Sequence, residues 1–168
     1  MASGADVNFL SDKQLPEWNE EYTQKGTGNS ALHLACWLGL DRAIVDRLLE
    51  LGSDVHLKSL DDGYLPIHTA TNRGKVELVG HLLDKGCDPN AKDNLGDSPL
   101  MWSSNRGHKE VVELLLDRGA NINDIDDEGM TSLMMASVQG YKEVVELLLD
   151  RGANINDIDN RGMTSLMW

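Results

Sequence analysis

One unit of 33 residues recurs along most of the chain, and this repeat restricts its fold more than any other feature. The segment KEVVELLLDRGANINDID occurs at 109–126 and again at 142–159. The segment GMTSLM at 129–134 likewise recurs at 162–167. Weaker copies of the unit begin at Gly28, Gly63 and Gly96. A unit of this length cannot bury its own apolar face, so successive units must stack on one another.

Each unit predicts two short helices separated by tight turns. The first begins at a capping Ser or Thr followed by a residue suited to the first helical turn, as in Ser98-Pro99, and ends at a glycine such as Gly107. The second carries an apolar stripe at Val111, Val112, Leu115 and Leu116. Gly119 ends this helix, and the following Asn- and Asp-rich segment predicts an extended turn or loop.

The starts of the first helices carry a family pattern. The chain reads SALHLA at 30–35, LPIHTA at 65–70, SPLM at 98–101 and TSLM at 131–134. Closing segments of the type GANIN or GCDPN follow the second helices. In these motifs and in its period, the chain resembles the ankyrin repeat family. The resemblance implies an all-α solenoid of stacked helix–turn–helix units with β-turn or loop fingers.

The resemblance also divides the chain. Residues 1–27 would hold a partial repeat end and an inserted acidic loop, and 162–168 a truncated fifth repeat. Four full repeats are expected between them, at 28–62, 63–95, 96–128 and 129–161.

Several individual residues have a structural interpretation within this pattern. His33 and His68 occupy the family's helix-capping position, and Cys36 and Cys87 occupy small-residue positions where buried, inert thiols are expected. Met101 and Met134 replace the capping histidine, so we expect the corresponding hydrogen bond to be missing there. We place Trp102 in the core.

Charge and composition exclude several classes of function. Lys and Arg number 15 against 28 Asp and Glu, which gives a formal net charge of −13. Binding to nucleic acid or to an anionic membrane requires concentrated positive charge, so neither is expected. No apolar run approaches the roughly 18–20 residues that span a bilayer, and the N-terminus lacks a signal-peptide pattern. Two cysteines form no disulfide framework, which favours an intracellular, cytoplasmic location.

No motif predicts catalysis, a cofactor or a metal. The GTGNSA segment at 26–31 fits a dinucleotide fingerprint, but the preceding segment is too polar for the buried strand that this fingerprint follows. The DIDDEG segment at 124–129 resembles the start of a calcium loop, but Met135 stands where the bidentate glutamate is required. The histidines lack metal-ligand spacing, and no catalytic constellation is evident. We therefore expect a protein that is not an enzyme.

The remaining candidate for function is the surface. In ankyrin repeat proteins, partners usually bind along the concave side, through the turn tips and the exposed face of the first helix. Carried over to this sequence, the candidate partner-binding residues are Trp37, Leu38, Asp62, Tyr64, Asn72, Arg73, Leu95, Asp97, Asn105, Arg106, Glu128, Met130, Val138, Gln139 and Arg161. Trp37 is the strongest as an interface anchor, although it could instead pack against the inserted N-terminal loop.

These observations favour a non-catalytic protein–protein interaction module, a scaffold or adaptor, that binds its partner on the concave face. The alternative is a substrate-recruiting or regulatory arm of a larger enzyme, channel or degradation adaptor. Arg73 and Arg106 occupy equivalent positions between acidic tips, which suits an extended peptide that carries a carboxylate.

The C-terminal segment raises a separate expectation. Residues 162–168 repeat the start of a unit, so a first helix should form there and pack on the fourth repeat, with no second helix to cover it. Either the biological chain continues, or this uncapped end is buried by self-association.

Overall fold

The computed structural model describes residues 30–168. The expected partial repeat and inserted acidic loop at 1–27 lie outside the described residues, as does most of the glycine motif at 26–31.

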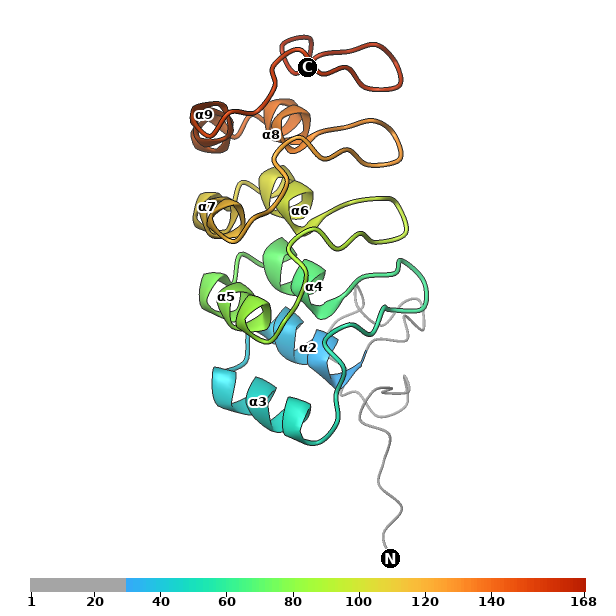
Figure 1. Cartoon of the computed structure of the whole chain (residues 1–168), viewed down its shortest axis with the longest axis vertical. Coiled ribbons are helices and arrows are strands. Elements are labelled where there is room, and N and C mark those ends of the chain that lie inside the picture. Colours follow the sequence, from blue (N-terminus) through green and yellow to red (C-terminus); the bar gives the residue numbers. More distant parts are fainter. Residues whose placement is uncertain (1–29) are drawn as a thin grey trace, which may run out of the picture.

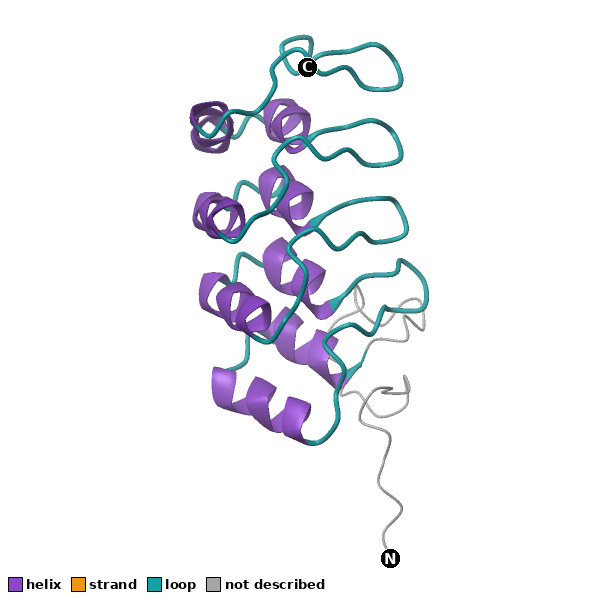
Figure 2. Ribbon diagram, in the orientation of Figure 1, coloured by secondary structure: helices purple, strands orange, loops and turns teal. Residues whose placement is uncertain are grey.

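Four antiparallel helix pairs stack in chain order (Figure 1). They are α2 (Ala31–Leu38) with α3 (Arg42–Glu50), α4 (Pro66–Asn72) with α5 (Val76–Asp84), α6 (Pro99–Asn105) with α7 (Lys109–Asp117), and α8 (Ser132–Gln139) with α9 (Lys142–Asp150). The first helices form one column and the second helices another, while long loops project on the side of the first column. The described residues contain helices and loops but no strand, apart from one isolated bridge between Ile125 and Thr131 (Figure 2). The prediction of an all-α solenoid is confirmed.

Histidine side chains cap the first two of these helix pairs, as expected. His33 Nδ1 accepts a hydrogen bond from the Ser30 backbone N–H at 3.2 Å, and His68 Nδ1 accepts one from the Leu65 N–H at 3.0 Å. The Nε2 atoms lie 2.8 Å from the Tyr64 carbonyl and 3.0 Å from the Ala91 carbonyl. Burial lowers the pKa of His68 to about 4, so the ring is neutral and its Nε2–H donates to the loop that leads into the next unit.

The expectation that methionine abolishes this cap is wrong for Met101. The Ser98 backbone N–H donates to Met101 Sδ at 3.4 Å, while Ser98 Oγ accepts from the Met101 N–H. The thioether is a weak acceptor, and its sulfur reaches the place that the imidazole nitrogen takes in the preceding repeats. At the next repeat, Thr131 Oγ1 accepts from the Met134 N–H.

Buried aliphatic side chains of both columns form one continuous core. Its fully buried members include Ile67, Leu82, Leu100, Leu115 and Leu148. Cys36 and Cys87 are buried and unpaired, as expected, and burial raises the pKa of the Cys87 thiol to about 12. The prediction that Trp102 belongs to the core is wrong, because its ring is only half-buried and lies on the side of the fingers.

The loops between helix pairs form fingers that are closed by carboxylates. Asp93 Oδ1 accepts the backbone N–H groups of Leu95 and Asp97, and Asp126 and Asp159 repeat this arrangement in the next two fingers. Neighbouring fingers are joined by backbone hydrogen bonds of 3.0 Å, such as that from the Asp127 N–H to the Leu95 carbonyl. The segment that resembles a calcium loop is therefore a closed acidic turn.

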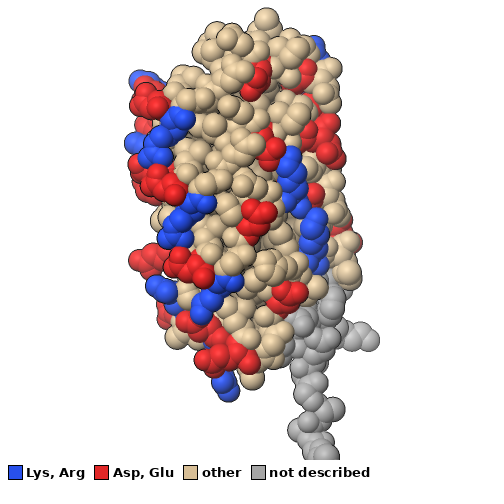
Figure 3. Space-filling model, in the orientation of Figure 1, with Lys and Arg blue, Asp and Glu red and all other residues tan. Residues whose placement is uncertain are grey.

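An ionic ladder joins the second helices on the opposite side. Arg118 pairs with Asp84 at 2.8 Å, and Arg151 pairs with Asp117 at 2.7 Å, each one repeat further along the chain. Figure 3 shows the resulting alternation of basic and acidic side chains along this edge. Exposed pairs of this kind contribute little individually, on the order of 0–1 kcal/mol.

The C-terminal segment differs from the expected helix. Residues after Gly162 form a turn, with one hydrogen bond from the Met167 N–H to the Thr164 carbonyl at 3.0 Å. A single turn fixes several dihedral angles for one hydrogen bond, which makes a helical nucleus unfavourable without packing. Leu166 and Met167 are 78% and 61% exposed. None of the helices in residues 30–168 is long and apolar enough to cross a membrane.

The identical helices α7 and α9 provide a test of stacking. Val112 is fully buried because α7 packs against both α5 and α9, whereas the equivalent Val145 of α9 is only partly buried. We expect Val112→Ala to lower the free energy of unfolding by about 2 kcal/mol and Val145→Ala by less than about 1 kcal/mol. Urea titrations of both variants measure the difference. Equal losses would contradict the stacking interpretation.

Candidate functional site

The candidate site lies on what we call the inner surface, formed by the fingers and by the exposed sides of α2, α4, α6 and α8 (Figure 1). Predicted site residues of successive repeats touch one another there. The Arg106 Nε–H donates to Asn72 Oδ1 at 2.8 Å, and Gln139 Nε2 donates to Asn105 Oδ1 at 3.1 Å. Each contact joins a residue to the one 34 positions later, so the same kind of link recurs from one repeat to the next across the stack.

Arg73 and Trp37 form a further contact between repeats. The Arg73 guanidinium carbon lies 4.5 Å from the centre of the Trp37 ring, a cation–π geometry. Trp37 is half-buried in this arrangement. Its alternative contact with the inserted N-terminal loop concerns residues outside the described part of the chain.

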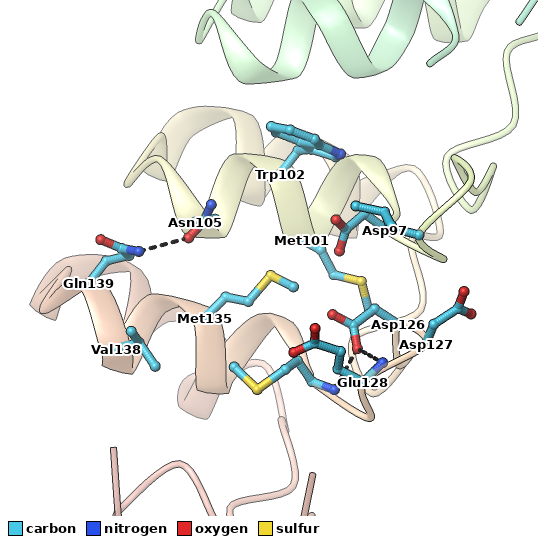
Figure 4. Close-up of a pocket in the computed structure, with 12 residues that line it drawn as sticks. Asp97, Met101, Trp102, Asn105, Asp126, Asp127, Glu128, Met135, Val138 and Gln139 are labelled. Atoms are coloured by element: carbon cyan, nitrogen blue, oxygen red, sulfur yellow. Dashed lines mark hydrogen bonds between the residues drawn. The ribbon is translucent and has the colours of Figure 1, made fainter. Parts of the chain in front are cut away.

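A groove of about 440 Å³ opens between α6 and α8 and the fingers that precede them (Figure 4). Its lining residues are Leu95, Asp97, Met101, Trp102, Asn105, Asp126, Asp127, Glu128, Met130, Met135, Val138 and Gln139. Seven of the fifteen predicted site residues are among them. The other eight lie outside the groove, and whether any of these residues bind a partner stays a prediction.

The two ends of the groove differ chemically. Asp97, Asp126 and Glu128 gather at the finger end, next to the Met101 thioether (Figure 4). Met135 points into the space between the two helices, and the far end is formed by Val138 with the Asn105–Gln139 pair. The groove therefore combines an acidic end with an apolar floor.

Burial and neighbouring carboxyl groups perturb the pKa of Asp97 strongly. Burial, followed by the charges of Asp93, Asp126, Glu128 and Asp127, raises the pKa of Asp97 to about 7. Its Oδ1 atom is buried and has no hydrogen-bond partner among the described residues. Asp126 is affected in the same direction, because burial raises its pKa against the effect of the two backbone N–H groups that it accepts.

Trp102 is held in place at the edge of the groove by two neighbours. Its Nε1–H donates to Asp93 Oδ2 at 3.0 Å, and the Tyr64 ring meets it edge-on with centroids 5.2 Å apart. Burial and the nearby charge of Asp62 raise the pKa of Tyr64 to about 12, so the phenol stays protonated at neutral pH. Asp93 thus both closes its finger and orients the indole ring.

Other predicted residues lie apart from the groove. Leu38 is 37% exposed at the end of α2. Arg161 contacts Asp159 in its own finger at 3.4 Å, and its guanidinium lies 4.4 Å from the centre of the Trp168 ring. Neither residue lines the groove.

Sequence reasoning missed Met101, Trp102, Met135, Asp93 and Asp126 as parts of the site. The sequence does contain a signal that two of these residues belong to the site. Trp102 and Met135 stand three residues before the predicted positions 105 and 138, and residues so spaced lie on the same face of a helix. The large side chains at these two positions therefore belong to the inner surface.

We next consider a metal site and a reactive cysteine among the described residues. Residues 30–168 contain no group of three or more His, Cys, Asp or Glu side chains that could hold a metal ion. Burial raises the pKa of both cysteine thiols, so neither is a ready nucleophile at neutral pH.

Family models match most of the described chain. The model for ankyrin repeats in three copies matches residues 67–159, and the model for a single ankyrin repeat matches residues 27–60. These matches cover all four helix pairs, except for the beginning of α4 at Pro66.

Curated relatives match over shorter segments. The inactive serine/threonine-protein kinase TEX14 of Bos taurus is 36% identical over 75 residues, which are 45% of this chain and 5% of that protein. The 2-5A-dependent ribonuclease of Mus musculus is 35% identical over 57 residues, 34% of this chain and 8% of that protein. Protein phosphatase 1 regulatory subunit 12A of Mus musculus is 33% identical over 72 residues, 43% of this chain and 7% of that protein. The chain thus matches only a small part of each of these three proteins.

Replacing Asp97 by asparagine should stabilise the protein at pH 8 and change little at pH 4. The folded pKa of about 7 lies above the ordinary value of 3.8, so the folded state binds this proton more tightly than the unfolded state. The contribution of Asp97 to the free energy of unfolding is fully present below pH 3.8, its ordinary pKa, and is lost as the pH rises through about 7. We expect Asp97→Asn to gain about 1 kcal/mol in free energy of unfolding at pH 8, because solvent screens part of the carboxyl charge.

Urea titrations of the variant at both pH values measure this dependence. Asp150→Asn at the exposed end of α9 is the matched control and should show no such dependence. An Asp97→Asn effect that is the same at pH 4 and pH 8 would contradict the burial of this charge.

Proposed function

The chain belongs to the ankyrin repeat family, and from this premise we propose that it is a non-catalytic interaction module that binds a protein partner along its inner surface. The repeat boundaries at 28–62, 63–95, 96–128 and 129–161 are part of this proposal. Members of such a fold serve many roles, so the proposal depends on the surface and not on the fold alone. We expect neither a cofactor nor binding to nucleic acid or membranes.

The groove between α6 and α8 is the observation that carries this proposal. It is a concave site with apolar and charged side chains close together, and such sites are the usual places where ligands bind. Leu95 and Val138, 60% and 42% exposed, add apolar surface at its rim. The rows of residues across α4, α6 and α8 extend this surface beyond a single repeat.

The charges of the inner surface suit an extended peptide segment of mixed charge. Arg73 and Arg106 stand at equivalent positions of consecutive repeats, and acidic finger residues flank them. Both arginines are held by neighbours, Trp37 and Asn72 respectively, which fixes their position before a partner arrives. A carboxylate of the partner would meet these two guanidinium groups.

Charge reversal tests this proposal. Peptides are first selected on the wild-type chain from a random-peptide display library, and their association is then measured with Arg73→Glu and Arg106→Glu. We expect the association rate to fall by about tenfold and its salt dependence to change, because these charges attract the partner during encounter. Arg42→Glu, at the exposed start of α3, is the control. Binding that is indifferent to both inner-surface changes would overturn the proposal.

A second candidate function is a regulatory or substrate-recruiting arm of a larger enzyme, channel or degradation adaptor. The relatives support this alternative, because the segments that match this chain make up 5–8% of an inactive kinase, a ribonuclease and a phosphatase regulatory subunit. A complete transcript that encodes a catalytic or adaptor segment next to these repeats would decide for this alternative. The two buried, unpaired cysteines fit an intracellular, cytoplasmic location in either case.

Self-association through the C-terminal turn is a further part of the proposal. Leu166 and Met167 are largely exposed there, and exposed apolar side chains at the end of a stack favour contact with another copy. Sedimentation velocity over a range of concentrations should show a dimer that Leu166→Ser with Met167→Ser abolishes. A chain that stays monomeric at high concentration would contradict self-association.

A further inference from the structure

The acidic end of the groove carries negative charge without a matching cation. Four of its lining residues are Asp or Glu, namely Asp97, Asp126, Asp127 and Glu128, and none of the described residues that line it is Lys or Arg. The charges that act on Asp97 are those of neighbouring carboxylates. Like charges held this close repel one another, so an incoming positive group would be stabilised here.

The carboxylates of this acidic end differ in the hydrogen bonds that they already accept. Asp126 Oδ1 accepts two backbone N–H groups at 2.9 and 2.7 Å and is committed to closing its finger. Asp97 Oδ1 has no hydrogen-bond partner among the described residues, although it is buried. Asp97 and Glu128 take part in no ion pair among the described residues, so their negative charge remains for a partner to match.

The apolar floor of the groove fits the methylene groups of a long side chain. Met135 extends between α6 and α8, and Met101 also lines this space (Figure 4). The flexible thioethers of methionine adapt to aliphatic chains. Lysine and arginine cover apolar surface with their methylene groups while the charged head reaches polar atoms.

We propose that this groove receives one basic side chain, arginine or lysine, of the protein partner. Its methylene groups lie along Met135, and its charged head donates hydrogen bonds to the carboxylates of Asp97 and Glu128. The inference rests on the proposed interaction function and goes beyond it by assigning the chemistry of one partner residue. It also gives the partner segment a polarity, since its basic residue lies between α6 and α8 and its carboxylate lies at Arg73 and Arg106, which directly follow α4 and α6.

The test uses the methionine methyl groups as reporters. Three of the seven methionines, Met101, Met130 and Met135, line the groove, and two others, Met163 and Met167, lie near the C-terminus. The protein is labelled with ¹³C at the methionine methyl groups and titrated with N-acetyl-arginine methylamide and N-acetyl-lysine methylamide. The matched uncharged probe is N-acetyl-norleucine methylamide. NMR spectra record which methyl signals move.

We expect the charged probes to shift the signals of the groove methionines in a saturable way, and the norleucine probe to shift them far less. The double variant Asp97→Asn with Glu128→Gln should weaken the charged probes by about tenfold. Asp150→Asn with Glu146→Gln, which removes the same charge from α9, should leave them unchanged. An unchanged signal of the buried Met134 shows that each variant is folded.

Several results would overturn the inference. They are the absence of any shift, an equal response to the norleucine probe, or an unchanged response in the Asp97/Glu128 double variant. A fourth is a stronger and saturable response of the same signals to calcium chloride, which would assign the acidic end to a metal ion instead.

Selected peptides separate this inference from the proposed function. Peptides that depend on Arg73 and Arg106 but tolerate replacement of each of their own basic residues by norleucine would leave the proposed function standing and overturn the inference. Probes that bind the groove while no peptide binds the inner surface would overturn the proposed function, and with it the assignment to a partner side chain. Peptides that lose about tenfold in affinity both with that replacement and with the double variant support both.

Discussion

Burial of one helix pair against the next is the interaction on which the rest of the structure depends. The helices α7 and α9 have the same nine residues, yet Val112 is fully buried and Val145 is only partly buried. The difference arises from the neighbours, because α7 packs against second helices on two sides. Short amphipathic helices of this kind gain their stability from tertiary packing and not from their own propensity. The inner surface exists only because this packing holds the first helices side by side.

Polar contacts then fix how the stacked units face one another. His33 and His68 each cap their own helix with one ring nitrogen and reach a carbonyl of the following loop with the other. These bonds are largely buried, where an unpaired polar group would be costly, so they select one position for each finger. The backbone bonds between fingers continue the same alignment. As a result the carboxylates of neighbouring fingers converge at the groove.

The repeat pattern predicted the fold well because the apolar stripe and the terminal glycines are local features. It predicted the groove less well, since Asp97 and Glu128 belong to different fingers and their approach depends on the stacking distance. Trp102 was misplaced in the core because periodicity identifies a helix face but not which neighbour covers it. The Met101 cap was missed because a family pattern records residue types, whereas the bond needs only an acceptor atom in the right place. The prediction of a C-terminal helix was wrong because a single turn has too few packing contacts to stabilise it.

The net charge of the chain is distributed unequally between the two sides of the stack. On the second helices, Asp84 and Asp117 are each paired with an arginine of the following repeat, so the outer edge is close to balanced. Around the groove, by contrast, no ion pair among the described residues involves Asp97, Asp126, Asp127 or Glu128. Burial of the Asp97 carboxyl, together with repulsion from the neighbouring carboxylates, costs stability, and the raised pKa of Asp97 is the sign of that cost. The same 33-residue unit thus produces a compensated outer edge, which supports the stack, and an uncompensated inner groove, whose charge is free to attract a partner.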